Sequence, residues 1–339
     1  MSSYRDSRRK SYRERPIVKA LTYSKRLFSA GNLPIFLAFL LLLLTVLLKP
    51  VNLQRPVYVF QIGFDISQSM NVADMMLNGE MQTRLDYAKA MAEAVLEELP
   101  CGSRVGWSVF TDRRTLTLLT PLDVCEHYSG LLAALDGING TMRWSNGSSI
   151  GKGIHQIMRT ADEYAEPTAV LFMTDGQEAP PLGQGQKGVP STEQFDVKGL
   201  LVGIGGRTPM PIPKTDMLDN PIGFWSANDV VQRQQPVFAF GGEELSYRDD
   251  ERLLALARHT QLGYVPLSSA AALIEGAINP EYASSSNVPT DVRWIPASIA
   301  LLLLLLQFLP RAVDIRTVIR QRSQNRVTIT TEVSNKGSN

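Results

Sequence analysis

Apolar runs along the chain alternate with stretches in which apolar residues recur at helical spacing. Val57–Phe64 is almost continuously apolar, which is typical of a strand covered on both faces of its sheet. Between Leu85 and Leu99 apolar residues recur at every fourth position, which predicts a helix with one buried face. Further strands are predicted at 104–110, 115–119, 169–173, 199–204 and 263–265, and further helices at 127–135, 150–164 and 250–260. The alternation predicts an α/β fold with a doubly wound, mostly parallel sheet flanked by helices.

Two longer apolar runs lie outside this pattern, at Leu33–Leu48 and Trp294–Leu309. Both lack charged side chains and are bounded by basic residues, which predicts one transmembrane helix within 33–49 and one within 293–310. A bilayer needs about 20 residues, so flanking residues or local thinning would have to cover the remainder. A buried core helix is the alternative, but such a helix would show a polar stripe.

The charges divide the chain into basic ends and an acidic middle. Residues 1–32 carry nine Lys or Arg against two acidic residues, and residues 311–339 carry six against two. Residues 50–291 carry 17 basic and 29 acidic side chains, a net charge of −12, which argues against a nucleic-acid partner. Because basic segments stay on the cytoplasmic side, we predict a two-pass protein of a bacterial inner membrane with both basic tails in the cytoplasm and residues 50–291 in the periplasm.

Oxygen-bearing side chains follow the first predicted strand, in the sequence Asp65-Ile66-Ser67-Gln68-Ser69. On a backbone that is still extended, Asp65, Ser67 and Ser69 would point the same way. Carboxylate and hydroxyl oxygens suit Mg²⁺, Ca²⁺ or Mn²⁺ and do not select zinc or copper. Ser148 stands at a loop-to-helix start, where an N-cap role also explains a serine. Asp175 follows the strand at 169–173, at an edge of the sheet where ligands bind in α/β folds.

Taken in this order, the motifs resemble the von Willebrand factor A (vWA) family, whose metal-ion-dependent adhesion site combines D-x-S-x-S with a Thr or Ser in a second loop and an Asp in a third. The residues carried over to this site are Asp65, Ser67, Ser69, Ser148 and Asp175. The resemblance implies that the three serines bind the metal directly and that the two carboxylates act through water or hydrogen bonds. Because Ser148 replaces the usual Thr, Ser149 is an alternative ligand. The implied ion is Mg²⁺, with Ca²⁺ or Mn²⁺ as alternatives, and it would bind a carboxylate of a partner protein.

The resemblance covers residues 55–278 and implies a Rossmann-like vWA domain with an irregular, Gly- and Pro-rich insertion at 179–224. Through Arg84-Leu85 and Arg104-Val105-Gly106 the chain is similar to Bat-type bacterial membrane vWA proteins. Within these, its two-helix layout with a periplasmic vWA segment most resembles the methanol dehydrogenase accessory proteins MxaL and MxaC. That likeness implies an assembly or maturation factor for a periplasmic enzyme, methanol dehydrogenase with its calcium, acting with a MoxR-type AAA+ ATPase and other vWA membrane proteins. The alternative is a structural subunit of another membrane complex with a Bat-like envelope or stress function.

An enzymatic role is not expected from these residues. Asp65 stands where haloacid-dehalogenase-type phosphatases have their nucleophile, but Ser67 occupies the position of the second Asp that they require. A metal-dependent phosphatase is therefore the less favoured alternative, and no catalytic residue is predicted.

Cys101 and Cys125 both fall in the segment predicted to lie in the periplasm. An oxidising compartment permits a disulfide between them, whereas two free buried thiols are the alternative. The sequence leaves both open.

Overall fold

The computed structural model describes residues 33–182, 188, 195–232 and 242–308. Both predicted basic tails, 1–32 and 311–339, lie outside the described residues. The chain divides into two compact units, Leu53–Val288 and a smaller one that combines Met1–Asn52 with Pro289–Asn339.

The larger unit is built on a seven-stranded sheet with the order β12-β7-β6-β1-β4-β5, and β13 pairs with β1. The strands are β1 (Val51–Asp65), β4 (Arg104–Thr111), β5 (Arg114–Asp123), β6 (Ala169–Thr174), β7 (Gly199–Gly203), β12 (Gly263–Pro266) and β13 (Ala283–Thr290). Along the main path, neighbours are parallel except for β4 and β5, which form an antiparallel pair at one edge. The prediction of an α/β fold with a mostly parallel sheet is confirmed.

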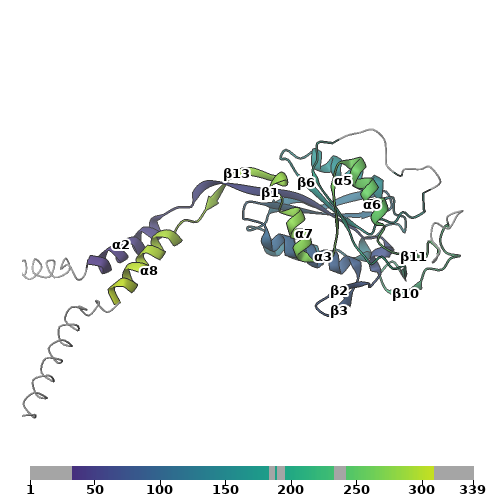
Figure 1. Cartoon of the computed structure of the whole chain (residues 1–339), viewed down its shortest axis with the longest axis horizontal. Coiled ribbons are helices and arrows are strands. Elements are labelled where there is room, and N and C mark those ends of the chain that lie inside the picture. The colour runs from purple at the N-terminus through teal and green to yellow at the C-terminus, as the bar shows by residue number, and fades with distance from the viewer. Residues whose placement is uncertain (1–32, 183–187, 189–194, 233–241, 309–339) are drawn as a thin grey trace, which may run out of the picture. The chain divides into compact units, whose positions relative to one another are not determined.

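Helices cover both faces of the sheet because the buried strands are apolar on both sides (Figure 1). Within β6, Leu171 and Met173 face one core while Val170 and Phe172 face the other. The first core is closed by α3 (Arg84–Glu98), α4 (Tyr128–Asp136) and α7 (Ala270–Ala277), and the second by α5 (Ile150–Asp162) and α6 (Asp250–Thr260). The helix α7 and the hairpin β2 (Met75–Leu77)–β3 (Glu80–Gln82) were not predicted.

The predicted insertion at 179–224 differs in extent from the structure. It contains β7, which is a buried strand of the central sheet, so the irregular part is split in two. After β7 the chain forms four short strands outside the main sheet: β8 (Met210–Pro211), β9 (Pro213–Thr215), β10 (Pro221–Phe224) and β11 (Leu245–Ser246). We call residues 210–232 the wall segment. Short strands interrupted by prolines carry no periodic apolar pattern, which is why the sequence did not reveal them.

A disulfide joins Cys101, just before β4, to Cys125, just after β5. The two Cα atoms lie 5.3 Å apart. The bond closes the antiparallel pair β4–β5 at the end away from their connecting turn.

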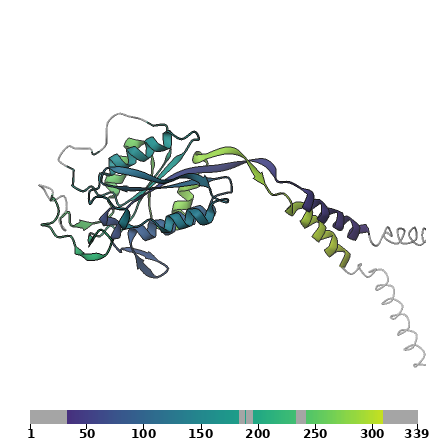
Figure 2. The ribbon, with the colours of Figure 1, turned by 180° about the vertical axis from the view of Figure 1, so that it is seen from behind.

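Among the described residues of the smaller unit, α2 (Leu33–Leu47) and α8 (Trp294–Phe308) lie side by side (Figures 1 and 2). Both helices coincide with the two apolar runs of the sequence. Within the described part of the chain, no helix combines the length and the apolar character needed to cross a bilayer. The predicted transmembrane helices are therefore not confirmed.

Candidate metal-binding site

The first loop of the candidate site begins where β1 ends, at the fully buried Asp65. Asp65 Oδ1 accepts a hydrogen bond from the backbone N–H of Ser67 at 2.9 Å, which turns the chain at once. Gln68–Asn71 then form a 3-10 turn, so the predicted extended backbone through Ser69 is wrong. The turn nevertheless brings the hydroxyls of Ser67 and Ser69 to 3.2 Å from each other. The two serines converge through this turn and not through strand alternation.

The second loop presents Ser148 through backbone pairing with two other segments. Ser148 N donates to the carbonyl of Ala179 at 2.6 Å, and Ala179 N donates back to Ser148 O at 2.8 Å. On its other side, Asp112 N donates to Gly147 O at 2.7 Å. These pairings make residues 147–149 a short extended segment held between two neighbours.

The side chain of Ser148 is buried, and its Oγ has no hydrogen-bond partner among the described residues. Leaving a buried hydroxyl without a partner costs about 1–3 kcal/mol, so such atoms point to a missing ligand. Ser149, in contrast, is the N-cap residue of α5, is half-buried and does not line the pocket described below. Helix capping therefore does not explain Ser148, and the structure groups Ser148, not Ser149, with Ser67 and Ser69.

The third loop follows β6 and carries the fully buried Asp175. Its Oδ1 accepts from Gln177 N at 3.1 Å, and its Oδ2 accepts from Ser246 Oγ at 2.9 Å and from Arg84 Nη1 at 3.0 Å. Gly176 follows with a φ of +89°, in the left-handed region that favours glycine.

Two buried carboxylates meet at this edge of the sheet because β1 and β6 are parallel neighbours. The pKa of Asp65 is raised to about 7, mainly by burial and further by the nearby carboxylate of Asp175. Hydrogen bonds from Ser67 and from Thr174, whose Oγ1 donates to Asp65 Oδ2 at 2.7 Å, act in the opposite direction. Within the described residues no Lys or Arg forms an ion pair with Asp65. A cation at this edge would offset the cost of burying the charge.

The donor set fits a hard divalent cation. Ser67, Ser69 and Ser148 line one cavity, Asp65 and Asp175 are buried at the ends of neighbouring strands, and the Oγ of Ser148 has no hydrogen-bond partner among the described residues. In the described part of the chain no group of three or more His, Cys, Asp or Glu side chains is placed to hold a metal ion. The direct-ligand roles of Ser67, Ser69 and Ser148 stay a prediction.

Arg84 is a functional candidate that the sequence analysis missed. Its side chain is fully buried, and besides Asp175 it contacts Asp74, with Nε 3.0 Å from Oδ1 and Nη2 2.7 Å from Oδ2. It also donates to the hydroxyl of Ser246 and to Ser69 O at 3.4 Å. Arg84 therefore ties the third loop to the first. The available signal was an arginine directly before the predicted helix at 85–99, with an aspartate ten residues before it.

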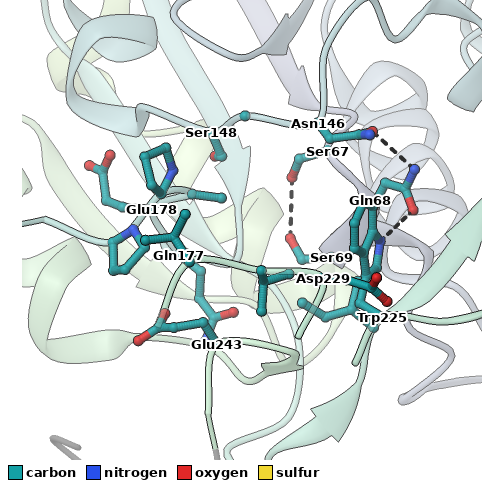
Figure 3. A pocket seen from close by; sticks show the side chains of 17 residues that line it. Ser67, Gln68, Ser69, Asn146, Ser148, Gln177, Glu178, Trp225, Asp229 and Glu243 are labelled. Carbon is teal, nitrogen blue, oxygen red and sulfur yellow. Dashed lines mark hydrogen bonds between the residues drawn. The ribbon is translucent and has the colours of Figure 1, made fainter. Parts of the chain in front are cut away.

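The three serines open into a cavity of about 300 Å³ (Figure 3). Besides the loops, it is lined by residues of the wall segment and its surroundings, which sequence reasoning did not assign to the site. These are Pro180, Pro181, Ile212, Trp225, Asp229, Val230, Val231 and Glu243.

A family model described as von Willebrand factor type A domain matches residues 64–177, a range that contains all three loops. These residues are similar to a vWA domain and form part of the larger unit, Leu53–Val288. The wall segment lies outside the matched range. No protein with a curated description matches the chain.

The solved structures that match the chain include two described as membrane proteins and a third described as BatB. An aerotolerance-related membrane protein from Bacteroides fragilis is 15% identical, and the match covers 65% of this chain and 96% of that one with a TM-score of 0.43. BatB from Bacteroides thetaiotaomicron is 20% identical, with 65% and 95% covered and a TM-score of 0.42. An uncharacterised membrane-spanning protein from Vibrio fischeri is 15% identical, with 64% and 94% covered and a TM-score of 0.27.

Proposed function

We propose that this chain is a membrane-anchored vWA protein that binds a partner protein through a divalent cation, and that it serves as an assembly or maturation factor. The observation that carries the proposal is the unpaired, buried hydroxyl of Ser148, which faces the same cavity as the paired hydroxyls of Ser67 and Ser69. In this proposal Mg²⁺, or Ca²⁺ or Mn²⁺ in its place, is held by the three serines with support from Asp65 and Asp175.

The hydrogen bonds of the two carboxylates support an ion that still attracts an external carboxylate. Both oxygens of Asp65 accept hydrogen bonds within the domain, and Asp175 shares its charge with Arg84 and Ser246. Hydrogen-bond donors of the protein thus partly neutralise the negative charge of these two carboxylates. A cation whose direct ligands are neutral hydroxyls keeps much of its charge available, so a carboxylate of the partner gains a strong interaction with it.

The surroundings of Asp65 favour binding over catalysis. A carboxylate nucleophile must reach its substrate, whereas Asp65 is fully buried and hydrogen-bonded through both oxygens. Together with Ser67 in place of a second Asp, this supports a protein that is not an enzyme.

The apolar runs in α2 and α8 and the basic ends support anchoring in a bacterial inner membrane, with both termini in the cytoplasm and the vWA domain in the periplasm. The disulfide between Cys101 and Cys125 agrees with an oxidising compartment. By resemblance, the client is a periplasmic enzyme, methanol dehydrogenase receiving its calcium, and a MoxR-type ATPase with other vWA membrane proteins acts alongside.

A second candidate is a structural subunit of another membrane complex, with a Bat-like role. Three hydrogen bonds between the wall segment and Gln68 of the first loop or Arg143 favour it, because a rigid surface suits permanent assembly. In that function the metal would only stabilise the loops, and partner binding would persist without it.

Binding of calcium-free methanol dehydrogenase to the full-length chain in detergent separates the two candidates. The proposal predicts binding in Mg²⁺ that is lost in EDTA and in Ser148→Ala, while Ser149→Ala binds normally. Binding that survives both EDTA and Ser148→Ala would refute a contact through the cation and leave the metal, as in the second candidate, only the role of stabilising the loops. Absence of binding in Mg²⁺ would remove this enzyme as the client.

A further inference from the structure

The wall segment forms a side of the cavity that is chemically unlike the metal loops. Ile212, Trp225 and Val231 supply apolar surface, and Val231 is 65% exposed. Pro180 and Pro181 line the cavity as well, so apolar groups come from two parts of the chain. An exposed apolar surface beside a polar site is typical of a binding surface.

Gln68 holds the wall segment against the first metal loop (Figure 3). Its Oε1 accepts from Trp225 Nε1 at 2.8 Å and from Thr215 N at 3.1 Å. Its Nε2 donates to Asn146 Oδ1 at 3.0 Å, two residues before Ser148. Because Gln68 stands between the two serines of the first loop, it fixes the indole ring relative to their hydroxyls.

Further contacts brace the same arrangement. Arg143 donates through Nε to Ile66 O at 2.7 Å and through Nη1 to Thr215 Oγ1 at 3.0 Å. Lys214 Nζ lies 4.6 Å from the centroid of the Trp225 ring. These contacts hold Trp225 in place without a ligand, which lowers the entropic cost of binding at this part of the cavity.

The charges around the cavity limit what can enter it. Asp229 and Glu243 line the cavity together with the apolar groups. A cation at the serines would attract one carboxylate. Lys214 Nζ lies 3.6 Å from Asp229 Oδ2 and offsets part of that charge, so Glu243 and the remaining charge of Asp229 disfavour a second carboxylate. The volume of about 300 Å³ is at the lower end of ligand sites, roughly 300–1,000 Å³, and suits a short piece of a peptide.

We infer that the wall segment is a specificity subsite for an exposed partner segment in which a single Asp or Glu is followed by an apolar residue. The carboxylate occupies the metal, and the apolar side chain packs against Trp225 and Val231. The inference rests on the proposed function, because the carboxylate needs the metal. It adds the identity of the neighbouring residue, which the three loops alone do not select.

Blocked tetrapeptides titrated into the full-length chain in detergent test the subsite. The probes are acetyl-Gly-Asp-Leu-Gly-amide, its relatives with Ser or Asp in place of Leu, and one with Asn in place of Asp, each measured with Mg²⁺ and with EDTA. We expect the Asp-Leu peptide to bind about tenfold more tightly than the Asp-Ser peptide, since partial burial of a leucine side chain contributes that much. The Asp-Asp peptide should be weaker than the Asp-Ser peptide.

Two exposed residues of the wall segment provide a matched pair of variants. Val231→Ser changes the cavity, whereas Phe224→Ser changes a residue that is 63% exposed and does not line it. Val231→Ser and Trp225→Ala should each reduce the preference for Leu over Ser to threefold or less, and Phe224→Ser should leave it unchanged. Neither exposed substitution removes core packing, so both variants should melt with the unmodified protein.

The outcomes separate the two proposals. If the Asp peptides bind only with Mg²⁺ but Leu and Ser are equivalent, the subsite is refuted and the proposed function stands. The subsite is also refuted if Phe224→Ser lowers the preference as much as Val231→Ser does. If no Asp peptide shows binding that depends on Mg²⁺, the proposed function fails and the subsite fails with it.

Discussion

Replacement of Arg84 by methionine should strongly destabilise the vWA domain. Methionine keeps much of the side-chain volume in this fully buried position but removes the charge and every hydrogen bond. Asp175, itself fully buried, would lose its only ionic partner among the described residues. Breaking one side of a buried ion pair typically costs about 3–5 kcal/mol, because the other charge stays buried without compensation.

An exposed ion pair in the same domain has the same atomic distance and provides the control. Arg104 Nη1 lies 3.0 Å from Glu166 Oε2, as Arg84 Nη1 lies 3.0 Å from Asp175 Oδ2, but the side chains of Arg104 and Glu166 are about half exposed. Water screens such a pair, so Arg104→Met should cost less than about 1 kcal/mol. Burial, and not distance, sets the difference.

Urea unfolding of the full-length chain in detergent, followed by tryptophan fluorescence, measures both variants. With an unchanged m-value, the midpoint of Arg84→Met should fall by an amount equivalent to about 3–5 kcal/mol. Adding Asp175→Asn to Arg84→Met should restore part of the loss, because the unpaired buried charge is removed as well. If Arg84→Met unfolds within about 1 kcal/mol of Arg104→Met, Arg84 does not support the third loop as described.

Three further predictions concern the scaffold of the site. At Gly176 an added Cβ would meet Leu253 Cγ at 2.8 Å, whereas an added Cβ at Gly79, which has a similar φ of +86°, would meet open space. Gly176→Ala should therefore lower the free energy of unfolding by at least about 1 kcal/mol more than Gly79→Ala. Equal losses in denaturant titrations would contradict this. Reduction of the disulfide, or Cys101→Ser with Cys125→Ser, should lower the free energy of unfolding by about 2–4 kcal/mol, because the bond closes a loop of 24 residues. An unchanged unfolding midpoint would show that the loop is already restrained in the unfolded chain. Burial alone would raise the pKa of Asp74, but the hydrogen bonds and charge of Arg84 outweigh burial and hold this pKa below its ordinary 3.8. The ion pair of Asp74 with Arg84 therefore stabilises the fold above pH 3.8, and this contribution is lost as the pH falls below that value. Asp74→Asn should therefore be less stable near neutral pH and lose less stability on acidification, and a steeper acid dependence in the variant would argue against the assignment.

Most strands of the central sheet and most of its helices could be predicted from the sequence, because their apolar patterns are regular. Predicted and observed bounds differ by only a few residues for β6, β7 and α6. The wall segment could not be predicted, since it has no periodic pattern. Its position depends on contacts between residues far apart in sequence, such as Gln68 and Trp225, which are 157 residues apart.

The residues of the candidate site could also be predicted only in part from the sequence. Asp65 and Asp175 could be placed because each follows a buried strand, and parallel neighbours end at one edge. The choice between Ser148 and Ser149 depends on backbone pairing with Asp112 and Ala179, which no local pattern shows. Arg84 was missed because it stands just before the apolar pattern that predicts the helix at 85–99, and a buried charge is not expected from such a pattern. The metal, the partners and the client remain predictions.

A titration with Mn²⁺ followed by electron paramagnetic resonance tests the central claim most directly, because free and bound Mn²⁺ give different signals. The claim is that Ser148 completes a cation site with Ser67 and Ser69. In the full-length chain we expect one bound Mn²⁺ that Mg²⁺ displaces. Ser148→Ala should lose about tenfold or more in affinity for Mn²⁺, since one fewer ligand costs at least about 1.4 kcal/mol. Ser149→Ala should bind Mn²⁺ with unchanged affinity. Equal affinities in the two serine variants and the unmodified chain, or no displaceable Mn²⁺ at all, would contradict the account.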